Sequence, residues 1–265
     1  MRSHGPCLAA ANYAQSLITR ASPCYEWRTK GSQQVVLRPK AGRRVMSKSR
    51  SSAHRPGRLV ARQPAYGEHA RSYDRDTSAF QPYRQAIVEA LPVCPGQVVL
   101  DVGCGTGLCC GLLREKVGAR GGVVGIEESP EMAAVAREHI AEEGWHNVTV
   151  VQSRAEDAEI AVTADAALFC AVHDILQSPD ALQNVMSSLR PGALVAAGGG
   201  KWAAPVLVAV NMQTSMLHAP YVRSFDGFDR PWNRLEQLIE GVHVREVAFG
   251  SGYIVTGKAP PRTPA

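Results

Sequence analysis

Alternating glycines follow a short apolar run in the first half of this 265-residue chain. Residues 98–102 include Asp101, and Gly103, Gly105 and Gly107 come next. This pattern predicts a buried parallel strand that runs into a tight turn and then a helix. Glycines at these positions let the backbone bend sharply and let a ligand lie against it. Ligands of open α/β sheets bind beyond the carboxyl ends of such strands, so we expect a cofactor site here.

The glycine spacing separates several classes of cofactor site. A dinucleotide fingerprint needs glycine at its first, third and sixth positions, but the sixth position is Leu108 counted from Gly103 and Cys110 counted from Gly105. A phosphate-binding loop of the G-x-x-x-x-G-K-[ST] type needs a lysine that this segment lacks. The spacing therefore disfavours NAD and FAD and gives no support to a nucleotide-triphosphate loop.

The string from Asp101 to Gly107 instead resembles motif I of class I S-adenosylmethionine-dependent methyltransferases, D-x-G-x-G-x-G. The resemblance implies that Asp101, Gly103, Gly105 and Gly107 bind S-adenosylmethionine, and that the product is S-adenosylhomocysteine. A second apolar run ends at Glu127, where the family places a carboxylate that accepts hydrogen bonds from both ribose hydroxyls. A carboxylate suits this role because its two oxygens only accept hydrogen bonds.

Further positions match the cofactor site of that family. Ser129 can cap a helix that begins at Pro130, and Met132 then falls where the family places an apolar residue against the adenine. Cys170, at the end of a fourth predicted strand, is another expected cofactor contact.

Adenine recognition departs from the family pattern. An acid and then a small residue usually follow the third strand, which we expect at residues 147–152. Ala155 fits the small position, but Arg154 stands where the acid is expected. Either Glu156 supplies the carboxylate that binds the adenine amino group, or backbone or water holds that group.

Apolar runs alternate with helical segments along residues 64–258. We expect strands at residues 98–102, 123–127, 147–152, 165–170, 194–198, 242–249 and 253–257. Such alternation predicts a parallel sheet with right-handed crossovers. Only residues 250–252 join the last two strands, so these two strands must form an antiparallel hairpin. The fold class is therefore α/β: a Rossmann-like seven-stranded, mostly parallel sheet with an antiparallel last strand and helices on both faces.

Charge divides the chain into a leader, a domain and a tail. Residues 1–62 carry a net charge of +12, whereas residues 63–265 carry −7. We expect residues 1–63 to be a basic, disordered leader, residues 64–258 to form one class I methyltransferase domain, and residues 259–265 to be a Pro-rich tail. Three interpretations of the leader stay open: an organelle transit peptide, a basic tether, or upstream sequence before a true start at Met46.

Composition sets several expectations about location and metal content. No apolar stretch is long enough and free enough of charge for a transmembrane helix, so we expect a cytoplasmic protein, with organellar targeting by the leader as the alternative. The seven cysteines include no C-x-x-C pair, and no histidine stands at zinc spacing from them. We therefore expect reduced, buried thiols and no metal site. The acidic domain makes nucleic acid an unlikely partner.

Two segments are expected to cover the methyl acceptor above the ends of the fourth and fifth strands. The first, residues 64–91, is predicted to be helical from about Thr77 and resembles the family's lid. The second, at about residues 201–234, is inserted before a helix that we expect ahead of the sixth strand. The side chains expected to wall the acceptor pocket are Tyr66, His69, Tyr73, Phe80, Lys201, Trp202, Met212, Met216, His218, Tyr221, Phe225, Phe228 and Trp232. Such a wall suits a flat or lipophilic acceptor.

An acceptor that must lose a proton needs a base, and histidine titrates closest to neutral pH. His173 follows the fourth strand and His218 lies in the insertion, so both are candidate catalytic bases. Asp174 is placed to orient His173, although neighbours on a strand face apart. We expect Asp180 and Arg223 to be surface charges.

These features predict S-adenosylmethionine-dependent methyl transfer to the oxygen, nitrogen or carbon of a small aromatic or lipophilic acceptor. The resemblance is closest to small-molecule methyltransferases of the ubiquinone-biosynthesis type. Two alternatives remain: a non-catalytic S-adenosylmethionine-binding domain, or a methyltransferase for protein or nucleic acid that the basic leader recruits. The sequence does not indicate an oligomeric state.

Overall fold

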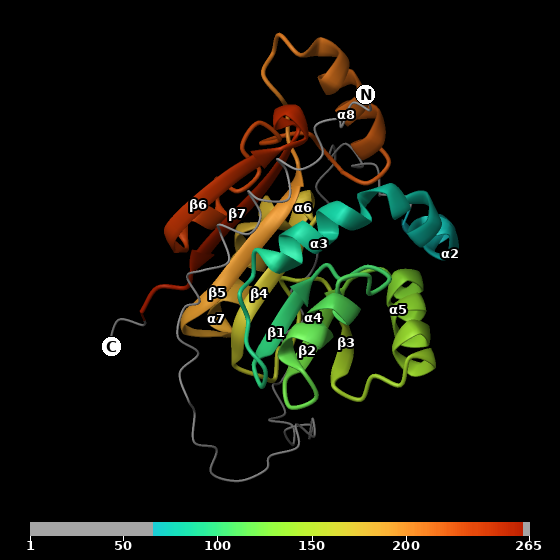
Figure 1. The fold of residues 1–265 in the computed structure, drawn as a ribbon, viewed down its shortest axis with the longest axis vertical. Coiled ribbons are helices and arrows are strands. Elements are labelled where there is room, and N and C mark those ends of the chain that lie inside the picture. The colour runs from blue at the N-terminus through green and yellow to red at the C-terminus, as the bar shows by residue number, and fades with distance from the viewer. Residues whose placement is uncertain (1–65, 262–265) are drawn as a thin grey trace, which may run out of the picture. The chain divides into compact units, whose positions relative to one another are not determined.

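The computed structural model describes residues 66–261, so the predicted leader at residues 1–63 and most of the tail lie outside the described residues. One sheet of seven strands runs in the order β3-β2-β1-β4-β5-β7-β6 (Figure 1). The strands are β1 (Val98–Val102), β2 (Gly122–Glu127), β3 (Val148–Gln152), β4 (Ala164–Cys170), β5 (Leu189–Gly200), β6 (Glu240–Val247) and β7 (Gly252–Lys258). Only β7 is antiparallel to its neighbours, β5 and β6, so the predicted fold class is confirmed.

Helices cover both faces of this sheet (Figure 1). The helices are α2 (Tyr66–Asp76), α3 (Gln81–Glu89), α4 (Cys110–Val117), α5 (Pro130–Glu142), α6 (His173–Leu176), α7 (Pro179–Ser187) and α8 (Val208–His218), with short 3₁₀ turns η1 (Ser78–Phe80), η2 (Leu235–Gln237) and η3 (Ala248–Gly250). The buried side chains of α3 and α4 pack on one face, and those of α7 and of residues 232–239 pack on the other. Within residues 66–261, no helix is both long and apolar enough to cross a membrane.

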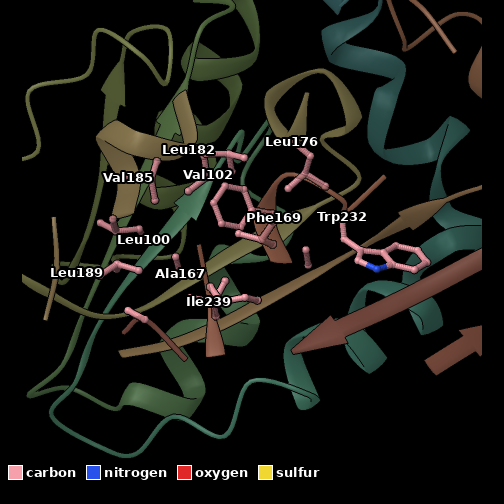
Figure 2. Packing of buried hydrophobic residues seen from close by; sticks show 14 of the residues in the cluster. Leu100, Val102, Ala167, Phe169, Leu176, Leu182, Val185, Leu189, Trp232 and Ile239 are labelled. Carbon is pink, nitrogen blue, oxygen red and sulfur yellow. The ribbon is translucent and has the colours of Figure 1, made fainter. Parts of the chain in front are cut away.

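The alternation of strand side chains builds the two cores. Val99 of β1 joins the core under α3 and α4, whereas its neighbour Leu100 joins the core under α7. Figure 2 shows the second core, in which Leu100 and Phe169 of the sheet face the side of α7 that carries Leu182 and Val185. Both faces of β1 and β4 are therefore buried, and only the carboxyl ends of these strands are available to a ligand.

The structure differs from the sequence prediction at three places. Helix α2 precedes the predicted helix start at Thr77, because its sequence is polar on average and offers few apolar residues to mark a helix. Strand β5 begins at Leu189, five residues before the predicted strand, because Leu189 pairs with Ala164 and a register shift then accommodates the left-handed Gly192. The helix expected before β6 is only the short turn η2. Leu235 and neighbouring apolar residues are buried against the sheet and hold this segment in place.

Candidate functional site

Left-handed glycines form the turn after β1. The φ angles of Gly103, Gly105 and Gly107 are +71°, +57° and +86°, values that side chains disfavour. The Gly103 N–H donates to the carbonyl of Ile126 at 2.8 Å and ties the turn to β2. A Cβ at Gly103 would collide with Val172, whereas a Cβ at Gly105 would meet nothing within 4 Å. Packing thus requires Gly103, and Gly105 leaves open space along the backbone.

Glu127 ends β2 with its carboxylate directed at this turn. Its Oε2 accepts a hydrogen bond from the N–H of Gly105 at 2.9 Å, and its Oε1 accepts one from the N–H of Ser129 at 2.8 Å. Burial raises the pKa of the Glu127 carboxyl, and these backbone bonds oppose that rise. Each carboxylate oxygen can accept more than one hydrogen bond, so Glu127 can also bind hydroxyl groups.

A first pocket lies along the glycine turn at the carboxyl ends of the central strands. Seven of the nine predicted cofactor residues line it: Gly103, Gly105, Glu127, Met132, Ala155, Glu156 and Cys170. The other two, Asp101 and Gly107, do not line it. Gly107 packs against Ala136 of α5, with 3.5 Å between an added Cβ and the Ala136 Cβ. Asp101 is 1% exposed beneath the turn, and burial raises the pKa of its carboxyl to about 7.

Helix α5 begins as predicted. The Ser129 side chain accepts a hydrogen bond from the N–H of Met132 at 3.3 Å, with Pro130 in the first turn. The Met132 side chain is 1% exposed and lines the first pocket. Beyond it, Arg154 Nε donates to Glu156 Oε1 at 2.8 Å, so the residue that replaces the expected acid is itself bound to the nearby acid.

Helix α2 lies against the glycine turn and α5. Thr106 in the turn donates a hydrogen bond to Asp74 of α2, and His139 Nδ1 of α5 lies 3.0 Å from the carbonyl of Thr106. Tyr73, beside Asp74, lines the first pocket. The predicted covering role of this segment is therefore consistent with the position of α2.

A second pocket of about 500 Å³ adjoins the first. Its walls come from α2 and α3, from the ends of β4 and β5, from α8 and from the β6–β7 turn. The residues that line both pockets are Tyr73, Cys170, Ala171, His173 and Tyr221. Ala171 has a left-handed φ of +58°, an uncommon conformation for alanine at a turn between two pockets.

The structure places both predicted histidines at the second pocket but in different states of hydrogen bonding. His173 Nε2 lies 3.0 Å from the carbonyl of Asp226, which can only accept, so Nε2 carries the proton. Its Nδ1 is buried and has no hydrogen-bond partner within the described residues. Burial lowers the pKa of His173, and it lowers the pKa of His218 to about 4. Both imidazoles are therefore neutral near pH 7.

The predicted aromatic wall is only partly correct. Phe80, His218, Tyr221 and Phe228 line the second pocket, and Trp202 packs behind Phe228 with ring centroids 5.0 Å apart. Met212 and Met216 instead face solvent, being 62% and 76% exposed, because α8 turns that face away from the sheet. Trp232 stacks in the core on Tyr253, with ring centroids 4.7 Å apart. The structure does not describe the side chains of Tyr66 and His69.

Two arginines were missed or misassigned by sequence reasoning. Arg223, expected to be a surface charge, lines the first pocket and lies 2.5 Å from Glu128 and 3.8 Å from Asp174. Arg84 of α3 lines the second pocket and is 8% exposed. Arg84 lies four residues after Phe80 and three before Ile87, which places it on the apolar face of the helix. This spacing could have identified Arg84 as a buried residue from the sequence.

The match to a protein-family model covers the first five strands, β1 to β5. Residues 95–205 match the family model described as "Methyltransferase domain". The chain is 27% identical over 202 residues to an uncharacterized 37.1 kDa protein in transposon TN4556 of Streptomyces fradiae, covering 73% of this chain and 56% of that protein. It is 36% identical over 93 residues to an aklanonic acid methyltransferase of Streptomyces sp. strain C5, covering 35% of this chain and 42% of that protein. The chain thus spans about half or less of these curated relatives.

The fold is also found among solved structures. A SAM-dependent methyltransferase from Aquifex aeolicus aligns with a TM-score of 0.53 at 20% identity, covering 73% of this chain and 98% of that one. At this identity the likeness concerns the fold.

Proposed function

We propose that this chain, whose residues 95–205 match a methyltransferase-domain model, transfers a methyl group from S-adenosylmethionine to a small aromatic or lipophilic acceptor. One observation carries the proposal: the pocket at the glycine turn shares five wall residues with a second, larger pocket. A methyl donor in the first pocket and a methyl acceptor in the second would lie next to each other at these shared residues. The similarity to an aklanonic acid methyltransferase supports a small-molecule acceptor.

The residues of the first pocket fit this cofactor. The open space at Gly105 admits a ligand against the backbone, and the buried Glu127 carboxylate offers two oxygens to ribose hydroxyls. Met132 and Ala155 would supply apolar contacts for the adenine, and Glu156 in the same wall would supply the carboxylate for its amino group. Asp101 and Gly107 would act indirectly. Asp101 is buried beneath the glycine turn, and Gly107 lets α5 pack closely against that turn.

When bound, S-adenosylmethionine would supply a methyl group from its sulfonium, with the electron pair of the carbon–sulfur bond left on sulfur. The protein has to orient the acceptor and exclude water, and orientation alone can lower such a barrier by about 7–11 kcal/mol. Tyr73 and Tyr221, whose ring centroids lie 5.8 Å apart edge to face, both line the shared wall, where aromatic rings would stabilise the sulfonium cation.

A phenol or amine acceptor must also lose a proton, and we assign that proton to His218. Its imidazole packs over Gly200 in the acceptor pocket and is neutral, because burial lowers its pKa to about 4. His173 is less suited, because Nε2 already donates to Asp226 and Nδ1 is buried. His173 therefore shapes the wall between the pockets rather than accepting the proton.

Calorimetric titration of the full chain with S-adenosylmethionine, S-adenosylhomocysteine and NAD tests the cofactor assignment. Micromolar binding of the first two and not of NAD is expected. Transfer of labelled methyl groups to phenols, quinones and aromatic acids then tests catalysis. Cofactor binding without transfer to any acceptor class would favour a non-catalytic binding domain, and tight binding of NAD alone would contradict the proposal.

A further inference from the structure

Arg84 is a buried cation in the wall of the second pocket. Its guanidinium donates to the Thr77 carbonyl at 3.2 Å, to the Thr77 hydroxyl at 2.6 Å and to Gln81 Oε1 at 3.2 Å. All three acceptors are neutral. Arginine is rarely buried to this extent unless its charge is paired, because removing a charge from water is costly.

No carboxylate in the described part of the chain compensates this charge. Among residues 70–261, whose side chains the structure describes, no Asp or Glu forms an ion pair with Arg84. Among the described residues that line the second pocket, none is acidic, and Arg84 is the one lysine or arginine. The pocket is thus an apolar space with one positive charge in its wall.

Most other polar groups in that wall already have partners. The Tyr83 hydroxyl shares its one proton between the carbonyls of Gly199 and Tyr253, while the Thr214 hydroxyl donates to the carbonyl of Val210 at 2.8 Å. The Ser251 hydroxyl donates to Ala248 at 2.7 Å. Tyr73, next to Arg84, keeps its proton, because burial raises the pKa of its phenol to about 12 despite the opposing effect of the guanidinium.

We infer that the methyl acceptor is an aromatic or lipophilic acid whose carboxylate pairs with Arg84, with the Tyr73 hydroxyl as a second donor. This inference rests on the proposed function and names the substrate class of the second pocket. A planar guanidinium matches a carboxylate geometrically, and a charge-assisted pair away from water is stronger than a neutral one. Arg84 is therefore a specificity-determining residue, distinct from the histidines that face the same space.

A pair of probes of equal shape tests this inference: 2-naphthoate and its uncharged amide, 2-naphthamide. Binding to the full chain is measured by calorimetry with and without S-adenosylhomocysteine, extended to one-ring and three-ring acid and amide pairs. We expect the acids to bind about 10- to 100-fold more tightly than the amides. The R84Q variant should lose this preference, and R84K should retain part of it. The matched control T77V, which removes a hydrogen bond to the guanidinium but keeps its charge, should retain it.

The outcomes separate the two proposals. Equal binding of acids and amides to the natural protein, or a preference that survives in R84Q, overturns the role of Arg84. Binding of S-adenosylhomocysteine with no binding of any acid also overturns it and leaves the proposed cofactor function intact. Absence of cofactor binding contradicts the proposed function. The comparison of acid and amide without cofactor still tests whether Arg84 selects a carboxylate. The comparison in the natural protein does not depend on any variant folding.

Discussion

The backbone N–H of Gly105 donates a hydrogen bond to the Glu127 carboxylate, with 2.9 Å between N and Oε2. This bond joins the turn after β1 to the end of β2, across 22 residues of sequence. The same carboxylate lines the first pocket. Glu127 therefore has both an architectural role in the turn and the proposed role in binding ribose, and substitutions can separate the two.

Replacing Glu127 by Gln should weaken S-adenosylmethionine binding about 10- to 100-fold, because a neutral amide replaces a charge-assisted acceptor. The amide oxygen can still accept one backbone N–H, so the free energy of unfolding should change less than in E127A. Calorimetry and thermal unfolding measure the two effects. E142Q, the same charge change at an exposed site of α5, should leave the affinity unchanged. Unchanged cofactor affinity in E127Q would refute the ribose assignment.

Substituting Ala for Gly105 should block cofactor binding, because the new methyl group would occupy the open space beside the turn. The left-handed backbone also costs about 1–2 kcal/mol of stability for a side chain. Gly144 provides the control, since its φ is +64°, close to the +57° of Gly105, and a Cβ there also meets nothing within 4 Å. G144A should lose similar stability but keep its cofactor affinity. Equal affinities in the two variants would show that nothing binds against Gly105.

The H218N substitution should lower kcat for a phenolic acceptor by about 10²- to 10⁴-fold, the usual contribution of a general base. The affinity of H218N for S-adenosylmethionine should equal that of the natural protein. The control H243N alters an exposed histidine and should keep the natural kcat. A base works when deprotonated, and burial lowers the pKa of His218 to about 4. Activity should therefore be level from pH 6 to 8, as measured in a pH–rate profile. A fall in rate centred on the ordinary histidine pKa of about 6.5 would contradict this assignment.

Asp101 should make the cofactor-free protein less stable as the pH rises. Burial raises the pKa of its carboxyl from 3.8 to about 7, so the folded state binds more protons than the unfolded state between these values. By linkage, stability is then lost as the pH rises through this window, by on the order of 2–4 kcal/mol. D101N cannot ionise and should gain in Tm relative to the natural protein at pH 8 but not at pH 4. Parallel Tm curves of the two proteins from pH 4 to 8 would show that Asp101 ionises normally.

The sequence predicted the parts of the site that depend on neighbouring residues. Gly103, Gly105 and Glu127 follow short apolar strands, and the carboxyl ends of adjacent parallel strands meet at one sheet edge. The Ser129 cap is likewise a local motif and is confirmed. These features were predictable because spacing along the chain fixes them.

The acceptor side was less predictable because it depends on contacts between distant segments. Arg84 reaches the same space as His218, which lies 134 positions later, and only the folded chain brings them together. Met212 and His218 lie within a single helix, yet their exposures differ because the orientation of α8 on the sheet decides which face is buried. Periodicity alone gave α8 no clear apolar face, so the exposed side could not be identified from the sequence.

Helix α2 packs on α5 and also contacts the glycine turn beside the proposed cofactor site. Asp74 contacts Thr106 of the glycine turn, and Tyr73 lines both pockets. Any ligand that steadies the turn must then also steady α2, since the two share these contacts. Occupation of the first pocket would slow hydrogen exchange at the amides of α2, and the docking of this helix would complete the wall against which the acceptor binds. Such coupling favours an order of events in which the cofactor enters before the acceptor.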